Sequence, residues 1–267
     1  MKMAQANVSN ALVGLLTTQY HEDREIIPGH MTILNDLKLE MSDYFNFKMH
    51  RKLPVIREIF NRLKDQEGDY CIYSNVDISV RPDFYQFVCE KVNLGYDAFV
   101  VNRRTIPPKF KDISEYDDMC MEVGEKHPGF DCFIFKKELL DKFEMGNAGL
   151  GANWIGRVII TNLIVHAKKF EIFEDEFKTF HIGDDRSWKN PDFADYDEFN
   201  RQELIKILIK YRLQFKGDTS KVSYLNEFLY KDMKWNEDGK NPYIASHDHQ
   251  KPNILKRVWN KILSILR

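Results

Sequence analysis

The chain has 267 residues, 43% of them hydrophobic and 30% charged, with a formal net charge of −2. This composition is ordinary for a soluble protein, and the length allows a large core that needs no disulfide or metal to hold it together. The near-zero charge and a pI of about 6.5 argue against a nucleic-acid partner, because such proteins usually carry a basic surface.

The four cysteines form no C-x-x-C pair, so a zinc site is not expected. Cys71 and Cys132 stand in apolar runs and are expected to be small core residues. These features predict a reduced, cytoplasmic protein. The apolar run at 11–16 is too short to span a membrane, and no other segment approaches the roughly 18 apolar residues that a span needs.

The first quarter of the chain carries weak structural signals. Residues 12–18 predict a buried strand whose polar end makes Thr17 a candidate substrate contact. A weak helical period covers 31–41, and a short apolar stretch predicts a strand at 44–47. A helix is expected from 53 to about 65, with a proline near its start, where the missing N–H costs little.

From residue 70 onward, strands and helices alternate. Strands are expected at 70–78, 98–101, 131–135, 170–173 and 179–182, and helices at 82–92, 113–123, 136–143, 152–166 and 197–213. The alternation predicts an α/β fold with a mixed, mainly parallel sheet and helices on both faces. No linker-like stretch precedes about residue 216, so we expect one domain over 1–215 and a C-terminal extension over 216–267.

One strand ends on a polar pair. Residues 70–73 are apolar or aromatic, and the chain then turns polar at Asn75 and Asp77. Side chains at i and i+2 of a strand point to the same side, so this pair can share one divalent cation such as Mg²⁺ or Mn²⁺. The alternative is local: Asp77 would cap the turn into 81–83, and Asn75 would bond the nearby backbone.

A second segment brackets a Pro-Gly turn with two polar residues, His127 and Asp131, before the apolar strand that starts near residue 131. A carboxylate at the edge of such a strand is costly to bury unless it is hydrogen-bonded or functional. Asp131 is therefore a candidate catalytic residue and His127 a candidate substrate contact, with an ordinary turn as the alternative.

A third segment places glycines 146, 149 and 151 before a helix start. Backbone N–H groups at such a place can face a phosphate or an acceptor hydroxyl, although a plain loop is the alternative. Asn153, Trp154 and Arg157 are candidate substrate contacts here. The spacing is not that of an ATP-binding P-loop.

A fourth segment sets His181 before a carboxylate pair, Asp184 and Asp185. A lone histidine is usually structural, but with Asp77 this one would complete a nitrogen and oxygen set that suits Mn²⁺. Three basic residues, Arg103, Arg104 and Arg157, are candidates for holding a diphosphate through paired N–H donors. A solvated surface charge is the alternative for each.

In their order along the chain, these segments resemble the GT-A glycosyltransferases. The segments are 74–78, 102–106, 127–133, 151–157 and 180–185, within a similarity over about residues 12–210. The resemblance implies a GT-A-like, Rossmann-like domain and a hexosyltransferase-type enzyme. Such an enzyme takes a UDP- or GDP-linked sugar and a glycan acceptor, as in surface polysaccharide or glycoconjugate synthesis. It also implies Mn²⁺ or Mg²⁺ at Asp77 and His181, with Asn75 near the donor ribose or the metal.

The chain departs from that pattern in two places. Asn75 stands where the metal element usually begins with a carboxylate, and the acidic residue of inverting enzymes is missing from 151–157. Asp131 is then the expected base, with Asp184 or Asp185 next. The alternatives are a non-catalytic nucleotide- or sugar-binding protein on the same scaffold and a transferase of another nucleotide-activated group.

The C-terminal segment 253–267 predicts an amphipathic helix. It has an apolar stripe that includes Trp259 and basic flanks. A helix of this kind can lie on an anionic membrane surface, pair with a second copy of the chain or dock on its own domain.

Overall fold

The structure is a computed structural model that describes residues 1–127, 129–184 and 190–214. The extension expected over 216–267, with its amphipathic helix, lies outside the described residues. Met1–Tyr211 forms one compact unit. Among the described residues, no helix combines the length and the apolar character needed to cross a membrane.

The N-terminal part is mostly irregular. Its elements are α1 (Lys2–Ala6), β1 (Leu16–Thr17), η1 (His21–Ile26), β2 (Thr32–Ile33), η2 (Met41–Asp43) and α2 (Ile56–Lys64). β1 and β2 pair in parallel, while the helix expected at 31–41 and the strand expected at 44–47 are not formed. Those two predictions are wrong, and the contacts of α2 explain the first of them.

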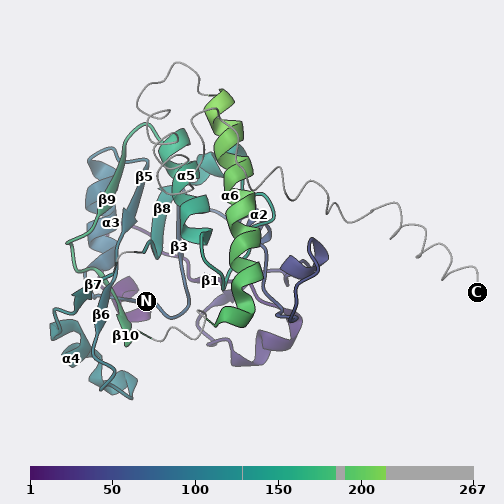
Figure 1. Ribbon diagram of the computed structural model, residues 1–267. Coiled ribbons are helices and arrows are strands. Elements are labelled where there is room, and N and C mark those ends of the chain that lie inside the picture. The colour runs from purple at the N-terminus through teal and green to yellow at the C-terminus, as the bar shows by residue number, and fades with distance from the viewer. Residues whose placement is uncertain (128, 185–189, 215–267) are drawn as a thin grey trace, which may run out of the picture. The chain divides into compact units, whose positions relative to one another are not determined.

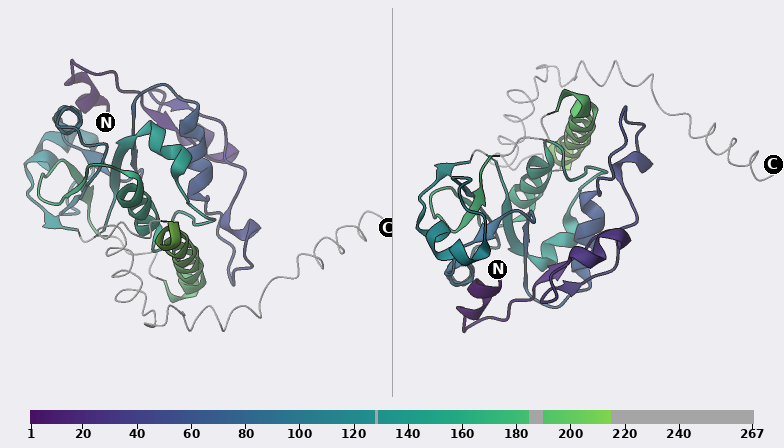
Figure 2. Two further views of the ribbon diagram at one scale, coloured as in Figure 1. Left: turned by 90° about the horizontal axis from the view of Figure 1, so that it is seen from above. Right: turned by 90° about the horizontal axis from the view of Figure 1, so that it is seen from below.

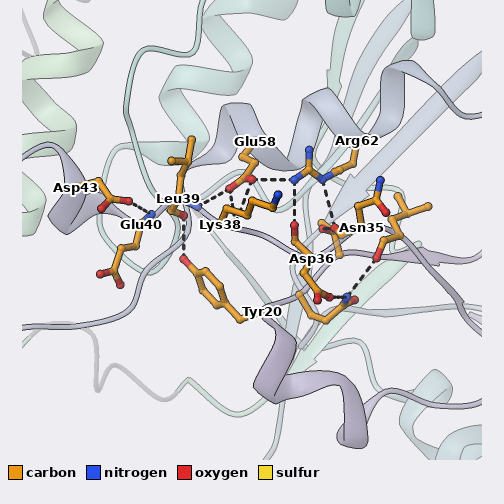
Figure 3. Close-up of polar contacts among 12 residues, drawn as sticks. Tyr20, Asn35, Asp36, Lys38, Leu39, Glu40, Asp43, Glu58 and Arg62 are labelled. Carbon is orange, nitrogen blue, oxygen red and sulfur yellow. Dashed lines mark hydrogen bonds and ion pairs between the residues drawn. The ribbon is translucent and has the colours of Figure 1, made fainter.

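Side chains of α2 hold the preceding segment in an extended form (Figure 3). The Glu58 carboxylate accepts the backbone N–H groups of Lys38 and Leu39 at 2.8–3.1 Å. Arg62 donates to the carbonyls of Asn35 and Asp36 and to Glu58. Backbone groups engaged in this way are not available for the i to i−4 bonds of a helix.

The central sheet has the strand order β3-β8-β5-β9 (Figure 1). Its strands are β3 (Tyr70–Ser74), β8 (Cys132–Lys136), β5 (Ala98–Val101) and β9 (Phe170–Phe173). β8 runs antiparallel to both of its neighbours, and β5 and β9 are parallel.

A second sheet has the order β4-β10-β6-β7. Its strands are β4 (Ser79–Val80), β10 (Thr179–Ile182), β6 (Arg104–Ile106) and β7 (Glu125–Lys126), and only β10 and β6 are parallel. The α/β class and the mixed pairing are therefore confirmed, while the single, mainly parallel sheet is wrong. The chain leaves the first sheet after β5, builds β6 and β7 in the second, and returns antiparallel as β8.

Helices cover both faces of the central sheet (Figure 2). On one face, α3 (Phe84–Asn93) packs Phe84 and Phe87 against Phe99 of β5 and Ile134 of β8. On the other face, Phe60 of α2 meets rings of β3 and β8. Successive strand residues point to opposite faces, and this alternation separates the two sets.

The remaining helices complete the unit. They are η3 (Ile113–Glu115), α4 (Tyr116–Met121), η4 (Lys137–Lys142), α5 (Ile155–His166), η6 (Pro191–Phe193) and α6 (Ala194–Gln214). α5 and α6 are joined by a buried polar network in which Asn162 accepts a hydrogen bond from the Tyr211 hydroxyl at 2.5 Å and His166 lies 3.0 Å from the same oxygen. The helix expected at 136–143 is a 3-10 helix.

Candidate functional site

Polar residues gather where three strands of the central sheet end. The last registered row is Ser74, Cys132 and Val101, on β3, β8 and β5. The next position outward on β8 is Asp131, and the next on β5 is Asn102, whose N–H still bonds the β9 residue Phe173 at 3.0 Å. The end of an inner strand is where open α/β sheets bind ligands.

His181 and Asp77 face each other beside this edge. Nδ1 of His181 lies 2.7 Å from the carbonyl oxygen of Gly183, and Nε2 lies 3.2 Å from Oδ2 of Asp77. A carbonyl only accepts, so Nδ1 carries the proton, and in the neutral imidazole Nε2 presents a lone pair. That lone pair and the carboxylate are both acceptors, so they need a second proton or a cation between them.

The pair fits a divalent cation. Its nitrogen and oxygen donors suit Mn²⁺, and the bond from Nδ1 to Gly183 fixes the tautomer as in metal-binding histidines. Within the part of the chain that the structure describes, no group of three or more His, Cys, Asp or Glu side chains could hold a metal ion. A two-ligand set is common for Mg²⁺, which takes its other ligands from substrate phosphates and water.

Asp131 lies in a compact cluster with Arg103 and His127. Oδ2 of Asp131 is 3.4 Å from Nε of Arg103 and 3.7 Å from Nε2 of His127. Nη2 of Arg103 is 3.3 and 3.4 Å from the two ring nitrogens of His127. One guanidinium thus contacts both a carboxyl group and an imidazole.

Burial sets the charge state of this cluster. Burial raises the pKa of the Asp131 carboxyl above its usual range, against Arg103 and His127, which favour the charged form. Burial also lowers the pKa of the His127 imidazole, and the charge of Arg103 lowers it further against the opposing effect of Asp131. A carboxyl that holds its proton more tightly than usual, beside a neutral imidazole, is typical of proton-transfer sites.

The two groups of residues influence each other electrostatically. The charge of Asp77 adds to the raised pKa of Asp131, and His181 acts on both Asp131 and His127. Asp184 also acts on the pKa of His127, so the structure brings it to the same region. Asp185, the other acidic candidate of that segment, lies outside the described residues.

Arg104 is engaged elsewhere. Its Nη2 donates to Oδ1 of Asp175 at 2.7 Å, and its guanidinium carbon lies 3.8 Å from the centre of the Phe177 ring. Neighbouring residues of an extended chain point to opposite sides, so Arg103 and Arg104 do not reach one site. Of the two candidates for a diphosphate contact, Arg104 is thus paired with Asp175 in this structure.

The glycine segment before α5 is hydrogen-bonded to side chains of α6. The N–H groups of Asn147, Gly149 and Asn153 donate to Glu203, Asn200 and Asp197, respectively, at 2.7–2.9 Å. These N–H groups are therefore not directed at a phosphate, and the Asn153 side chain also donates to Asp197. Asn153 stabilises the loop in this structure.

Two other candidates lie at the start of α5. Trp154 immediately precedes the helix with a φ of 75°, a left-handed conformation that is unusual for a bulky residue and often marks a functional site. The guanidinium carbon of Arg157 lies 5.3 Å from the centre of the Phe130 ring. Phe130 adjoins Asp131, so the first turn of α5 packs against the segment that carries this carboxyl group.

In the described residues, the hydrogen bonds of Thr17 and Asn75 involve their backbone groups. The backbone carbonyl of Thr17 accepts the N–H of Leu34 beside the β1–β2 pair. The backbone carbonyl of Asn75 accepts the N–H of Ile78 and a bond from the hydroxyl of Ser74, and the Asn75 side chain is exposed.

The sequence interpretation missed two groups. The Tyr73 hydroxyl is buried without a hydrogen-bond partner in the described residues, and burial together with Asp77 raises its pKa. Asn102 is also buried, and its Oδ1 has no partner there. A polar residue directly after the fully buried run 98–101 was the available signal for Asn102.

Comparison with known proteins gives structural similarity at low identity. No protein-family model matches the sequence, and no curated protein matches it. The structure is similar to S. aureus TarS 1-349 in complex with UDP-GlcNAc, with a TM-score of 0.42 and 10% identity over 82% of this chain and 66% of that chain. For TarS 1-349 in complex with UDP the values are 0.49 and 8% over 97% of this chain and 71% of that chain. These similarities assign no role to any residue here.

Proposed function

We propose that the chain is a GT-A-type glycosyltransferase that moves a sugar from a UDP- or GDP-linked donor to a glycan acceptor. The observation that carries the proposal is the pairing of Nε2 of His181 with the carboxylate of Asp77, beside the buried Asp131 at a sheet edge. A fixed nitrogen donor facing a carboxylate suits a divalent ion, and a buried carboxyl group with a raised pKa suits proton transfer.

The metal pair would serve the donor. Asp77 and His181 would hold Mn²⁺ or Mg²⁺, which supplies charge neutralisation for a nucleoside diphosphate leaving group. The bond from Nδ1 of His181 to Gly183 fixes the tautomer of the neutral ring, so that the lone pair of Nε2 faces Asp77. Asn75, at the same strand end, is proposed to contact the donor ribose or the metal.

The buried cluster would serve the acceptor. Asp131 accepts the proton of the attacking hydroxyl, and Arg103 orients the carboxylate and stabilises its charged form. His127 packs against the same guanidinium and contacts the substrate. Arg103 is thus proposed to organise Asp131 and His127, a role that differs from direct binding of the diphosphate.

A second candidate function is non-catalytic binding of a nucleotide or nucleotide sugar. Asn75 favours it, because this position usually supplies a carboxylate to the metal in GT-A enzymes and an amide oxygen binds a divalent ion less strongly. Fold and ligand would be the same in both cases, so only turnover separates them.

Calorimetry with and without Mn²⁺ tests the donor site. The probes are UDP, GDP and UDP-GlcNAc, and the proteins are the unchanged chain, Asp77→Asn and the matched control Asp83→Asn. Asp83 lies in a surface ion pair with Lys178 at 2.5 Å. We expect Mn²⁺-dependent binding that Asp77→Asn weakens at least about tenfold and Asp83→Asn leaves unchanged. Absence of binding to the folded, unchanged chain would refute the proposal.

Turnover separates the two candidate functions. An enzyme should slowly hydrolyse the bound sugar nucleotide without an acceptor, and Asp131→Asn should lower that rate by about 10²–10⁴-fold without abolishing nucleotide binding. Tight binding without release of UDP from any probe would favour the binding protein.

A further inference from the structure

Two buried acceptor atoms at adjacent positions of the sheet edge have no hydrogen bond within the described residues, although one of them faces Arg103. Asn102 is 6% exposed and Asp131 is 8% exposed. Among the described residues, Oδ1 of Asn102 has no hydrogen-bond partner. Oδ2 of Asp131 accepts no hydrogen bond there either, and its nearest charge is Nε of Arg103 at 3.4 Å. An unpaired buried polar atom costs roughly 1–3 kcal/mol, so the Asn102 oxygen is costly to the fold unless a ligand or water meets it.

The register of the strands explains why they are neighbours. Val101 of β5 pairs with Cys132 of β8 in antiparallel fashion, so the next residue of β5 and the preceding residue of β8 are Asn102 and Asp131. The backbone N–H of Asn102 still bonds the carbonyl of Phe173 at 3.0 Å, which continues the pairing of β5 with β9 for one more position. Opposed residues of an antiparallel pair have their Cβ atoms about 5 Å apart on one face.

The chemistry of the two atoms defines what they can bind. An amide oxygen and an ionised carboxylate oxygen both accept, so their partner must present hydrogen-bond donors. A phosphate is mainly an acceptor and does not meet this requirement. Neighbouring hydroxyl groups of a sugar ring present two O–H donors at short separation.

We propose that Asn102 and Asp131 form a subsite for two neighbouring hydroxyl groups of a sugar ring, with Asn102 as a specificity-determining residue. The proposal rests on the proposed function and names the sugar contacts of that same site. The ring belongs either to the donor sugar or to the acceptor glycan, and both present the same chemistry. Asn102 binds one hydroxyl and orients the ring, so that the neighbouring hydroxyl reaches Asp131.

Stability gives the first test, because it needs no ligand. Asn102→Leu replaces the amide with an apolar group of similar volume, and Asn102→Ala is the smaller second variant. Since the lost acceptor is unpaired, the melting temperature of Asn102→Leu should be unchanged or higher. The matched control is Asn200→Leu, whose fully buried amide makes three hydrogen bonds, and it should melt at a lower temperature.

Binding gives the second test, in two arms. In the donor arm, calorimetry with Mn²⁺ compares UDP with UDP-GlcNAc. In the acceptor arm, ligand-detected NMR follows glucose, galactose, mannose and N-acetylglucosamine, with UDP and Mn²⁺ and also without them. Asn102→Leu and Asn102→Ala should weaken the sugar contribution about tenfold in one arm, and that arm identifies the source of the ring. Binding of UDP itself should not change.

Each outcome decides the proposal. The proposal is overturned if Asn102→Leu melts at as low a temperature as Asn200→Leu, since Asn102 would then be structural. It is also overturned if Asn102→Leu and Asn102→Ala bind every sugar as the unchanged chain does, since Asn102 and Asp131 would then bind only water. If neither UDP nor GDP binds the unchanged chain, the proposed function fails. The free-sugar arm without nucleotide still decides the subsite in that case.

Discussion

Among single residues, Arg103 links the two other side chains of the buried cluster through its guanidinium group. It lies 3.4 Å from the Asp131 carboxyl group and 3.3 Å from the His127 ring, and all three side chains are largely buried. A positive charge beside an imidazole disfavours its protonation, and the same charge favours the ionised carboxylate. Arg103 therefore promotes the state in which His127 is neutral and Asp131 is able to accept a proton.

The His127 imidazole gives a pH prediction. Burial first, and then Arg103, lower its pKa in the folded protein below the ordinary value of 6.5. In the window just below 6.5 the unfolded chain therefore binds a proton that the folded chain does not, and the free energy of unfolding falls as the pH falls. His127→Gln should make this acid loss smaller between about pH 7 and pH 5, as measured by urea unfolding at several pH values.

The Asp131 carboxyl has the opposite effect on the pH dependence of the free energy of unfolding. Its folded pKa is raised by burial, so its contribution to stability is present below its unfolded pKa and is lost as the pH rises through the folded value. The matched control is His21→Gln, because the His21 side chain is 82% exposed. An equal pH slope in His127→Gln and the unchanged chain would show that His127 does not carry this linkage.

At the scale of elements, α6 shapes the loop that precedes α5. Asp197, Asn200 and Glu203 recur every third residue along the helix, and each accepts a backbone N–H of that loop. Gly149 fits closely between α6 and its surroundings, since a Cβ there would lie 2.3 Å from Cγ of Met41. The glycine at this position is thus explained by packing.

Asn200→Ala tests this helix-to-loop contact. The Asn200 amide accepts from the N–H of Gly149 and donates to the carbonyls of Gly149 and Asn153, at 2.8–2.9 Å. Loss of three buried hydrogen bonds should lower the free energy of unfolding by about 3 kcal/mol. Chemical denaturation measures the change. Gln202→Ala on the same helix, which loses one bond to Glu198, should cost less than about 1 kcal/mol, and equal costs would contradict the assignment.

At the scale of the whole molecule, the boundary near residue 215 remains a prediction. The compact unit Met1–Tyr211 contains the candidate site and both four-stranded sheets. We expect a chain that ends at residue 215 to unfold in one transition and to bind UDP with Mn²⁺ as the full chain does. The full chain alone should co-sediment with vesicles that contain phosphatidylserine, because 253–267 combines an apolar stripe with basic flanks.

Two comparisons separate the possible roles of this segment. Vesicles of phosphatidylcholine alone should bind the full chain less, since the basic flanks need anionic lipid. Analytical ultracentrifugation of both chains without lipid measures dimerisation. Equal sedimentation of both chains with anionic vesicles would refute the membrane role, and dimers of the full chain alone would assign 253–267 to self-association.

Local patterns were sufficient for several elements. The buried run 98–101 and the strands 170–173 and 179–182 were predicted with the bounds that β5, β9 and β10 have. The long α6 was predicted within a few residues at each end. The run 98–101 is apolar throughout, and apolar residues alternate with polar ones in 179–182, and both patterns are typical of strands.

Other segments depended on distant partners. The local sequence of 31–41 does not indicate that Glu58 and Arg62 bind backbone groups of this segment. The local sequence of 146–153 does not indicate that side chains of α6 accept its backbone N–H groups. The path from β5 into a second sheet, which makes β8 antiparallel, is likewise a choice between pairings of similar local propensity.

By itself, the sequence determined the α/β class, the strand that leads to Asp77 and the residue types of the candidate site, because these depend on short-range periodicity and on side-chain chemistry. Only the tertiary structure decided that Asp77 meets His181 and that Arg103 joins Asp131 while Arg104 turns to Asp175. It also decided that Oδ1 of Asn102 is buried without a hydrogen-bond partner among the described residues. The physical reason is that strand register and the alternation of side chains across a sheet place residues far apart in sequence on a common face.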